Sequence, residues 1–180
     1  MKPLTTKGIT LIEMVVIIVV MGLAIPALMT MWANVAWKSS CSEALANAFF
    51  YAQELMEVIK SKRFDEKTIA PYTNSNNFGV DTDENSNNNA TFDDVDDFVG
   101  ATDTWVTTPA NKYSRFVNVS YVFLNSTNSW QLCSLPVNCT TAVTDCSSCD
   151  QCCYKRIAVE VSHQGNLVNN LSLTTIVAAN

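Results

Sequence analysis

The chain has 180 residues, of which 11 are Lys or Arg and 17 are Asp or Glu, so its formal net charge is −6. This acidic balance argues against nucleic acid as a partner, because binding to phosphates needs a basic face. A hydrophobic content of 48% excludes a wholly disordered chain. With one histidine and no G-x-S-x-G sequence, the chain offers no basis for a nucleophilic site, and we expect no enzymatic activity.

The N-terminal segment is predicted to cross a membrane. The first segment, residues 1–8, is short and basic and ends in glycine. The run that follows, from Ile9 to Trp32, is apolar except for one charge, Glu13. As a helix, this run is about 36 Å long, whereas the bilayer core is about 30 Å thick. The two lysines of residues 1–8 predict that this end stays in the cytoplasm and that the remainder of the chain lies outside.

Three interpretations of this segment compete. A secretory signal peptide has a shorter apolar run and an A-x-A-like cleavage site, which the sequence lacks. A plain signal anchor accounts for length and orientation but not for Glu13. A carboxylate inside a spanning helix costs about 2.5–3.5 kcal/mol. Glu13 therefore needs either a partner or a position close enough to the membrane edge to reach water.

The third interpretation comes from a family resemblance. The segment KGITLIEMVV resembles the processing site of type IV pilin-like proteins. In that family a dedicated membrane peptidase cuts after the glycine and methylates the new first residue, which implies cleavage after Gly8 and methylation of Ile9. Glu13 matches the family's glutamate at the fifth mature position, whose proposed partner is the N-terminal amine of a neighbouring subunit. Ile9 stands where Phe is usual, and Pro26 lies about one turn earlier than in major pilins. Both differences favour a minor subunit.

The helix is predicted to continue beyond the membrane as far as Lys60. Apolar residues recur every three or four positions over 33–64, which is typical of an amphipathic helix packed under a sheet. The residues of this stripe are Trp37, Cys41, Leu45, Phe49, Ala52, Leu55, Met56 and Ile59.

Residues 65–180 are predicted to form a head with an α+β fold, in which the helix covers an antiparallel sheet. Strands are expected over 115–124, 156–161 and 171–177, because these runs are rich in β-branched residues or alternate apolar with polar residues. A turn at 164–166 predicts that the last two strands form an antiparallel hairpin. The fold that the resemblance implies, a pilin-like long helix on a sheet, is the same.

An acidic loop is predicted over 71–103. It contains the cluster Asp93, Asp94, Asp96 and Asp97. A solvated turn is the usual arrangement of such a run, and calcium binding by these four carboxylates is the alternative. No other cofactor is expected.

A second loop, over 133–153, is rich in cysteine. Because the head is predicted to lie outside the cytoplasm, disulfides are expected there, with metal binding or thiol exchange as the alternative. Six cysteines allow 15 pairings. Cys41, on the helix, could pair with this loop, pair between subunits or remain a buried thiol. The six loop cysteines are Cys133, Cys139, Cys146, Cys149, Cys152 and Cys153.

The resemblance implies a structural subunit of a type IV pilus-like filament. The segments AQELMEVIKSKRFDE, TFDDVDDFVG and YKRIAVEVSH resemble minor pilins of MSHA-type fimbriae. The implied partners are other pilin subunits, the prepilin peptidase and an assembly platform in the bacterial inner membrane. The implied locations are that membrane for the single-pass precursor and an extracellular pilus for the mature subunit.

Two alternatives to this function stay open. The first is a type II secretion pseudopilin in a periplasmic filament, because its N-terminus is nearly the same. The second is a membrane-anchored binding protein, outside the cytoplasm, that never polymerises.

Overall fold

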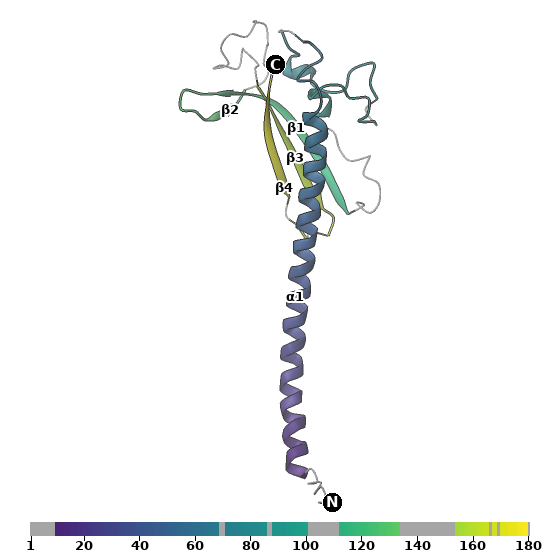
Figure 1. Ribbon diagram of the computed structural model, residues 1–180, viewed down its shortest axis with the longest axis vertical. Coiled ribbons are helices and arrows are strands. Elements are labelled where there is room, and N and C mark those ends of the chain that lie inside the picture. The colour runs from purple at the N-terminus through teal and green to yellow at the C-terminus, as the bar shows by residue number, and fades with distance from the viewer. Residues whose placement is uncertain are drawn as a thin grey trace, which may run out of the picture. The chain divides into compact units, whose positions relative to one another are not determined.

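The computed structural model describes residues 10–68, 71–85, 88–100, 112–133, 154–165, 167–168 and 170–179. These residues form one long α-helix, two short 3-10 helices and an antiparallel four-stranded sheet (Figure 1). The prediction of a long N-terminal helix with an antiparallel sheet is therefore confirmed. The elements are α1 (Leu11–Lys60), η1 (Ser75–Asn77), η2 (Asp96–Phe98), β1 (Tyr113–Leu124), β2 (Trp130–Leu132), β3 (Tyr154–His163) and β4 (Leu171–Ala178).

Helix α1 is continuous through Pro26. Glu13 lies in its first turn and Lys60 in its last turn, and both charges have the sign that the helix dipole favours at those ends. All residues from Leu11 to Trp32 are exposed. The helix is long and apolar enough to cross a membrane.

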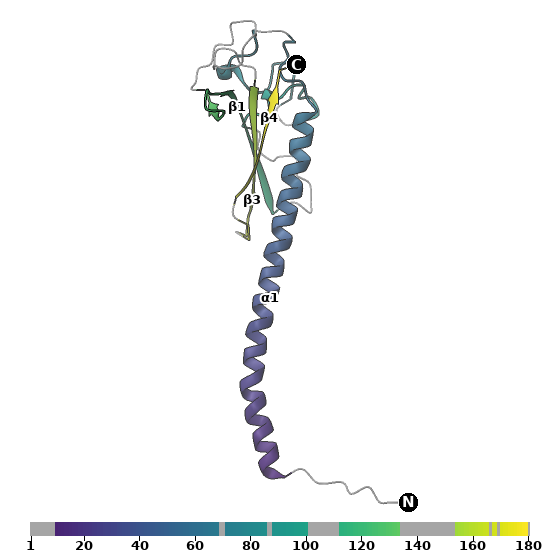
Figure 2. The ribbon, with the colours of Figure 1, turned by 60° about the vertical axis from the view of Figure 1, so that its left-hand side comes forward.

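The chain divides into two compact units, 1–42 and 43–180. The second unit contains the last part of α1, which lies along the sheet in both ribbon views (Figures 1 and 2). The helix contributes six residues to the buried core of this unit: Ala44, Ala48, Ala52, Leu55, Met56 and Ile59. An amphipathic end of the helix therefore covers the sheet, as the sequence predicts.

The sheet has the strand order β2-β1-β3-β4. Val119 of β1 lies opposite Ile157 of β3, which in turn lies opposite Thr175 of β4. Side chains alternate between the two faces of a strand, so every second residue of β1 and β3 can reach the helix. The three predicted strands and the antiparallel pairing of the last two are confirmed.

The structure differs from the prediction in which residues of α1 pack on the sheet. We predicted Leu45 and Phe49 at this contact, but each keeps 49% of its surface exposed, whereas Ala44 and Ala48 are 5% and 1% exposed. Alanine methyl groups allow a helix backbone to approach a sheet closely, and they carry a weaker hydrophobic signal than leucine or phenylalanine. The predicted stripe was therefore wrong at these two positions.

Strand β2 was not predicted. It has three residues, which is too short to show an alternating pattern. The turn before it is fixed by Asn125, whose side chain accepts hydrogen bonds from the backbone N–H groups of Thr127 and Ser129. Asn128 takes a positive φ of 56° in this turn.

Candidate functional site

The first turn of α1 presents Glu13 on an apolar helix. The backbone N–H of Glu13 donates to the carbonyl of Thr10 at 3.1 Å, and its side chain is exposed among exposed apolar residues. Gly8 and Ile9, the predicted processing residues, lie outside the described residues. The structure thus places the predicted assembly carboxylate in the first turn of an exposed apolar helix.

The cysteine predictions are tested at two positions. Cys133, which follows β2, is buried against Tyr121 and is disulfide-bonded. Cys41 is a free, half-buried thiol in α1, so this chain does not bond it to the cysteine-rich loop. The remaining members of the predicted disulfide set lie outside the described residues, and they are Cys139, Cys146, Cys149, Cys152 and Cys153.

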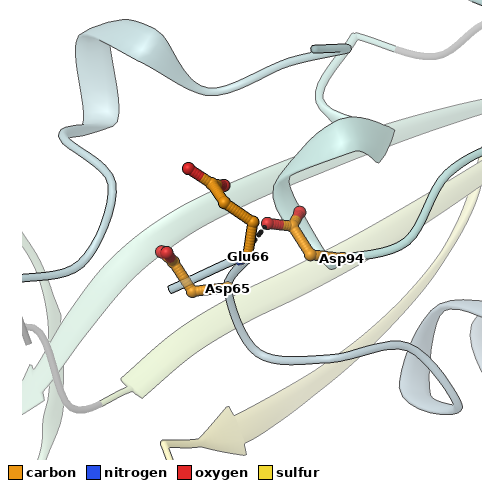
Figure 3. Close-up of side chains that lie close together, drawn as sticks. All are labelled: Asp65, Glu66 and Asp94. Atoms are coloured by element: carbon orange, nitrogen blue, oxygen red, sulfur yellow. Dashed lines mark hydrogen bonds between the residues drawn. The ribbon is translucent and has the colours of Figure 1, made fainter. Parts of the chain in front are cut away.

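A second candidate site is a cluster of carboxylates in the head. The chain leaves α1 and at Arg63 forms a parallel bridge to Asp94. The N–H of Val95 donates to the carbonyl of Arg63 at 3.0 Å. This bridge brings Asp65 and Glu66 beside Asp94, although they lie almost 30 residues apart in the chain (Figure 3). The N–H of Glu66 donates to Oδ2 of Asp94 at 2.8 Å.

The predicted acidic cluster folds back on its own backbone. Asp94 Oδ1 accepts a hydrogen bond from the N–H of Asp96 at 2.8 Å, and Asp97 Oδ2 accepts from the N–H of Asp93 at 3.0 Å. Such local bonds are a common reason for aspartates to form turns. Asp94, Asp96 and Asp97 are only 1% to 3% exposed. The expectation of a solvated acidic turn was therefore wrong.

Lys155 of β3 lies at the centre of this region. Its side chain is fully buried, and its Nζ contacts Oδ1 of Asp96, lies 3.2 Å from Oδ2 of Asp65 and donates to the carbonyl of Phe64 at 2.6 Å. Three aromatic rings lie with their centroids 4.6 to 5.5 Å from Nζ, and they belong to Phe64, Phe78 and Tyr121. Lys155 was not predicted as a site residue. One feature of the sequence could have identified it: Lys155 is two residues before Ile157, so both side chains lie on the face of β3 that packs in the core.

Burial perturbs the acidity of the cluster. Desolvation raises the pKa of Asp96 to about 8, against the opposing effect of Lys155, and raises the pKa of Asp97 to about 6. The pKa values of Asp94 and Glu66 are raised as well, with burial again the largest cause. The carboxyls thus share a tendency to bind protons or another cation.

Among the described residues, two groups of carboxylates could hold a metal ion. Within each group the carboxylate oxygens lie within 4.8 Å of one another, and oxygen-only sets suit calcium. The predicted set Asp93, Asp94, Asp96 and Asp97 does not converge, because Asp96 contacts Lys155 and the other three divide between the two groups. Calcium binding stays a prediction. The two groups are Asp65, Glu66 and Asp94, and Glu84, Asp93 and Asp97.

The stability of the head is expected to fall as pH rises from about 4 to about 6. Folded Asp97 keeps its proton up to a pKa of about 6, whereas the unfolded chain releases it near 3.8, so rising pH favours unfolding over this interval. Asp97→Asn should flatten this part of the profile. The measurement is the thermal midpoint of the full chain in detergent micelles, with calcium chelated. An unchanged slope in the variant would contradict the assignment.

The single histidine, His163, is 7% exposed at the end of β3, and its ring packs against that of Tyr113 with centroids 4.8 Å apart. Its Nδ1 accepts a hydrogen bond from the N–H of Gly165 at 3.0 Å. These contacts give His163 a structural role.

Comparison of the chain with protein-family models, with curated proteins and with solved structures returned no match. The resemblance to type IV pilin-like proteins therefore rests on the sequence of residues 7–16, on the apolar run that follows and on the shorter head segments.

Proposed function

We propose that this protein is a structural minor subunit of a type IV pilus-like filament, of the kind found in MSHA-type fimbriae. In this proposal the precursor enters the inner membrane, is cut after Gly8, is methylated at Ile9 and is assembled through α1. The observation that carries the proposal is Glu13, a carboxylate one turn into an exposed apolar helix and next to the processing motif.

The exposed surface of α1 supports assembly through this helix. Leu11, Leu23 and Trp32 keep 83%, 74% and 76% of their surfaces exposed, and the residues between them are exposed and, apart from Glu13 and Thr30, apolar. A continuous apolar surface of this size needs lipid or other apolar surfaces around it. The proposed route supplies the membrane first and a bundle of pilin helices afterwards.

The position of Glu13 supports a specific partner. Cleavage after Gly8 creates a positive α-amine at Ile9, and an amine of a neighbouring subunit could neutralise the carboxylate. Opposite charges attract strongly in an apolar bundle, and an unpaired charge there is costly. This pairing would therefore fix the axial offset between subunits.

A further observation favours a polymer over a plain membrane anchor. In the head unit, α1 exposes Leu45, Phe49 and Phe50, with 49% to 65% of each surface accessible. A membrane anchor does not need aromatic residues on this part of its helix, whereas packed subunits can cover them. A type II secretion pseudopilin would use the same surface, so these two filament types are separated by experiment.

The test is mass spectrometry of filaments sheared from the native host. Cleavage at Met14 with cyanogen bromide releases a short N-terminal peptide. We expect this peptide to begin at N-methylated Ile9 in the sheared fraction. Protein found only in membranes with residues 1–8 intact would overturn the proposal and leave a simple anchor. Processed protein absent from sheared filaments would instead identify a periplasmic pseudopilin.

A further inference from the structure

The buried contact between Lys155 and Asp96 has no part in filament assembly as proposed above. The two residues belong to β3 and η2 and lie 59 residues apart in the sequence. Their side chains are 0% and 3% exposed, and the amine of one touches the carboxyl of the other. The fold therefore holds the amine of Lys155 against a carboxyl oxygen of Asp96, next to the carbon that an amide would use.

The surroundings of this contact exclude water. The aromatic rings of Phe64, Phe78 and Tyr121 surround Nζ. Burial of the ammonium and the carboxyl costs part of their hydration, although the ring faces attract the ammonium.

We propose that Lys155 and Asp96 form a covalent amide, an intramolecular isopeptide bond, in the mature protein. A bond forms between Nζ and Cγ of Asp96, and one C–O bond of that carboxyl breaks. The paired ammonium and carboxylate together become a neutral amide and one water molecule, and both hydrogens of the water come from the ammonium. The reaction needs no oxidant, reductant or other co-reactant.

Asp65 is placed to move the protons. Its Oδ2 lies 3.2 Å from Nζ of Lys155, within reach of a proton on the ammonium. Three donors hold this carboxylate, since the N–H and Oγ1–H of Thr73 donate at 2.9 and 3.1 Å and the N–H of Lys67 at 3.1 Å. Asp65 accepts the proton that frees the amine lone pair and returns it to the departing oxygen of Asp96. Asp65 is therefore the proton relay, and Cγ of Asp96 is the carbon that the amine attacks.

Two physical effects favour the amide here although it is unfavourable between free groups in water. Groups held in reacting geometry reach effective concentrations of about 10⁵–10⁸ M. The product also removes two charges from a site that burial makes costly for charge. Because surrounding rings keep water away, the reverse hydrolysis lacks its reactant.

The test uses the full chain purified from host membranes in detergent, then denatured, reduced, alkylated and digested with trypsin. A bonded Lys155 resists trypsin, so we expect peptide 68–112 joined to peptide 116–156, lighter by one water than the two separate peptides. Cleavage after Lys155 and an unmodified Asp96 in the same folded material would overturn the proposal. This readout does not depend on whether the protein is processed or enters a filament.

A variant of Asp65 tests its role in proton transfer separately from the contact between Lys155 and Asp96. Asp65→Asn keeps the shape of the side chain and removes the base, so bond formation should slow by about a hundredfold or more. The linked fraction is followed over time after synthesis, and cooperative melting of the variant confirms that it is folded. Linkage at the wild-type rate would exclude Asp65 as the relay, and Asp96→Ala should yield no linked peptide at all.

Discussion

Glu13→Ala is expected to remove the protein from sheared filaments while leaving cleavage after Gly8 intact. In the proposed assembly, the carboxylate neutralises the N-terminal amine of a neighbour in an apolar bundle. Without it that amine is an uncompensated charge, which costs about 2.5–3.5 kcal/mol in such surroundings. Because 1.4 kcal/mol is a factor of ten, incorporation should fall by at least about tenfold.

The matched control is Glu43→Ala, which removes an exposed glutamate from the same helix outside its apolar part. It should enter filaments normally. Glu13→Gln keeps the shape of the side chain and removes only its charge, so it should fail like the alanine variant. The measurement compares the sheared and membrane fractions by quantitative mass spectrometry. Normal incorporation of both Glu13 variants would contradict the assembly role and favour a plain anchor.

Lys155→Met is expected to destabilise the head by about 3–5 kcal/mol, which is the usual cost of removing one partner from a buried ion pair. The substitution leaves Asp65 and Asp96 buried without the cation that contacts both of them. If the pair is joined by an amide, the variant also lacks that bond, and the loss is larger. The measurement is the thermal midpoint of the full chain in detergent micelles.

Two further variants show whether charge causes this loss. Lys112→Met removes an exposed lysine of the head and should change stability little. Lys155→Met combined with Asp96→Leu removes one of the two carboxyls that Lys155 contacts, and part of the stability should return because only Asp65 then lacks its cation. A double variant as unstable as Lys155→Met alone would show that the carboxyl of Asp96 does not cause the loss.

Much of the fold could be predicted because its signals are local. The apolar run and its periodic continuation indicated α1 to within two residues at its start, and β-branched runs indicated β1, β3 and β4. The face of the helix that contacts the sheet was less predictable. Ala44 and Ala48 are buried there because the backbones of helix and sheet lie close together and leave room only for small side chains. That distance depends on the sheet, which lies much later in the chain.

The carboxylate cluster was only half visible in the sequence. Asp93 to Asp97 were recognisable as a group, but Asp65, Glu66 and Glu84 join it only after folding. Lys155 is 90 residues from Asp65, and no local pattern connects a lysine to a carboxylate at that separation. A solvated turn was expected because the sequence shows the charged side chains but not which other residues bury them in the fold.

The position of Lys155 also determines how the head takes up mechanical tension. Helix α1 ends at Lys60, and five residues later Asp65 contacts Lys155 on β3, the strand that pairs with both β1 and β4. A pull along the helix would thus enter the sheet at an inner strand, through side chains held away from water.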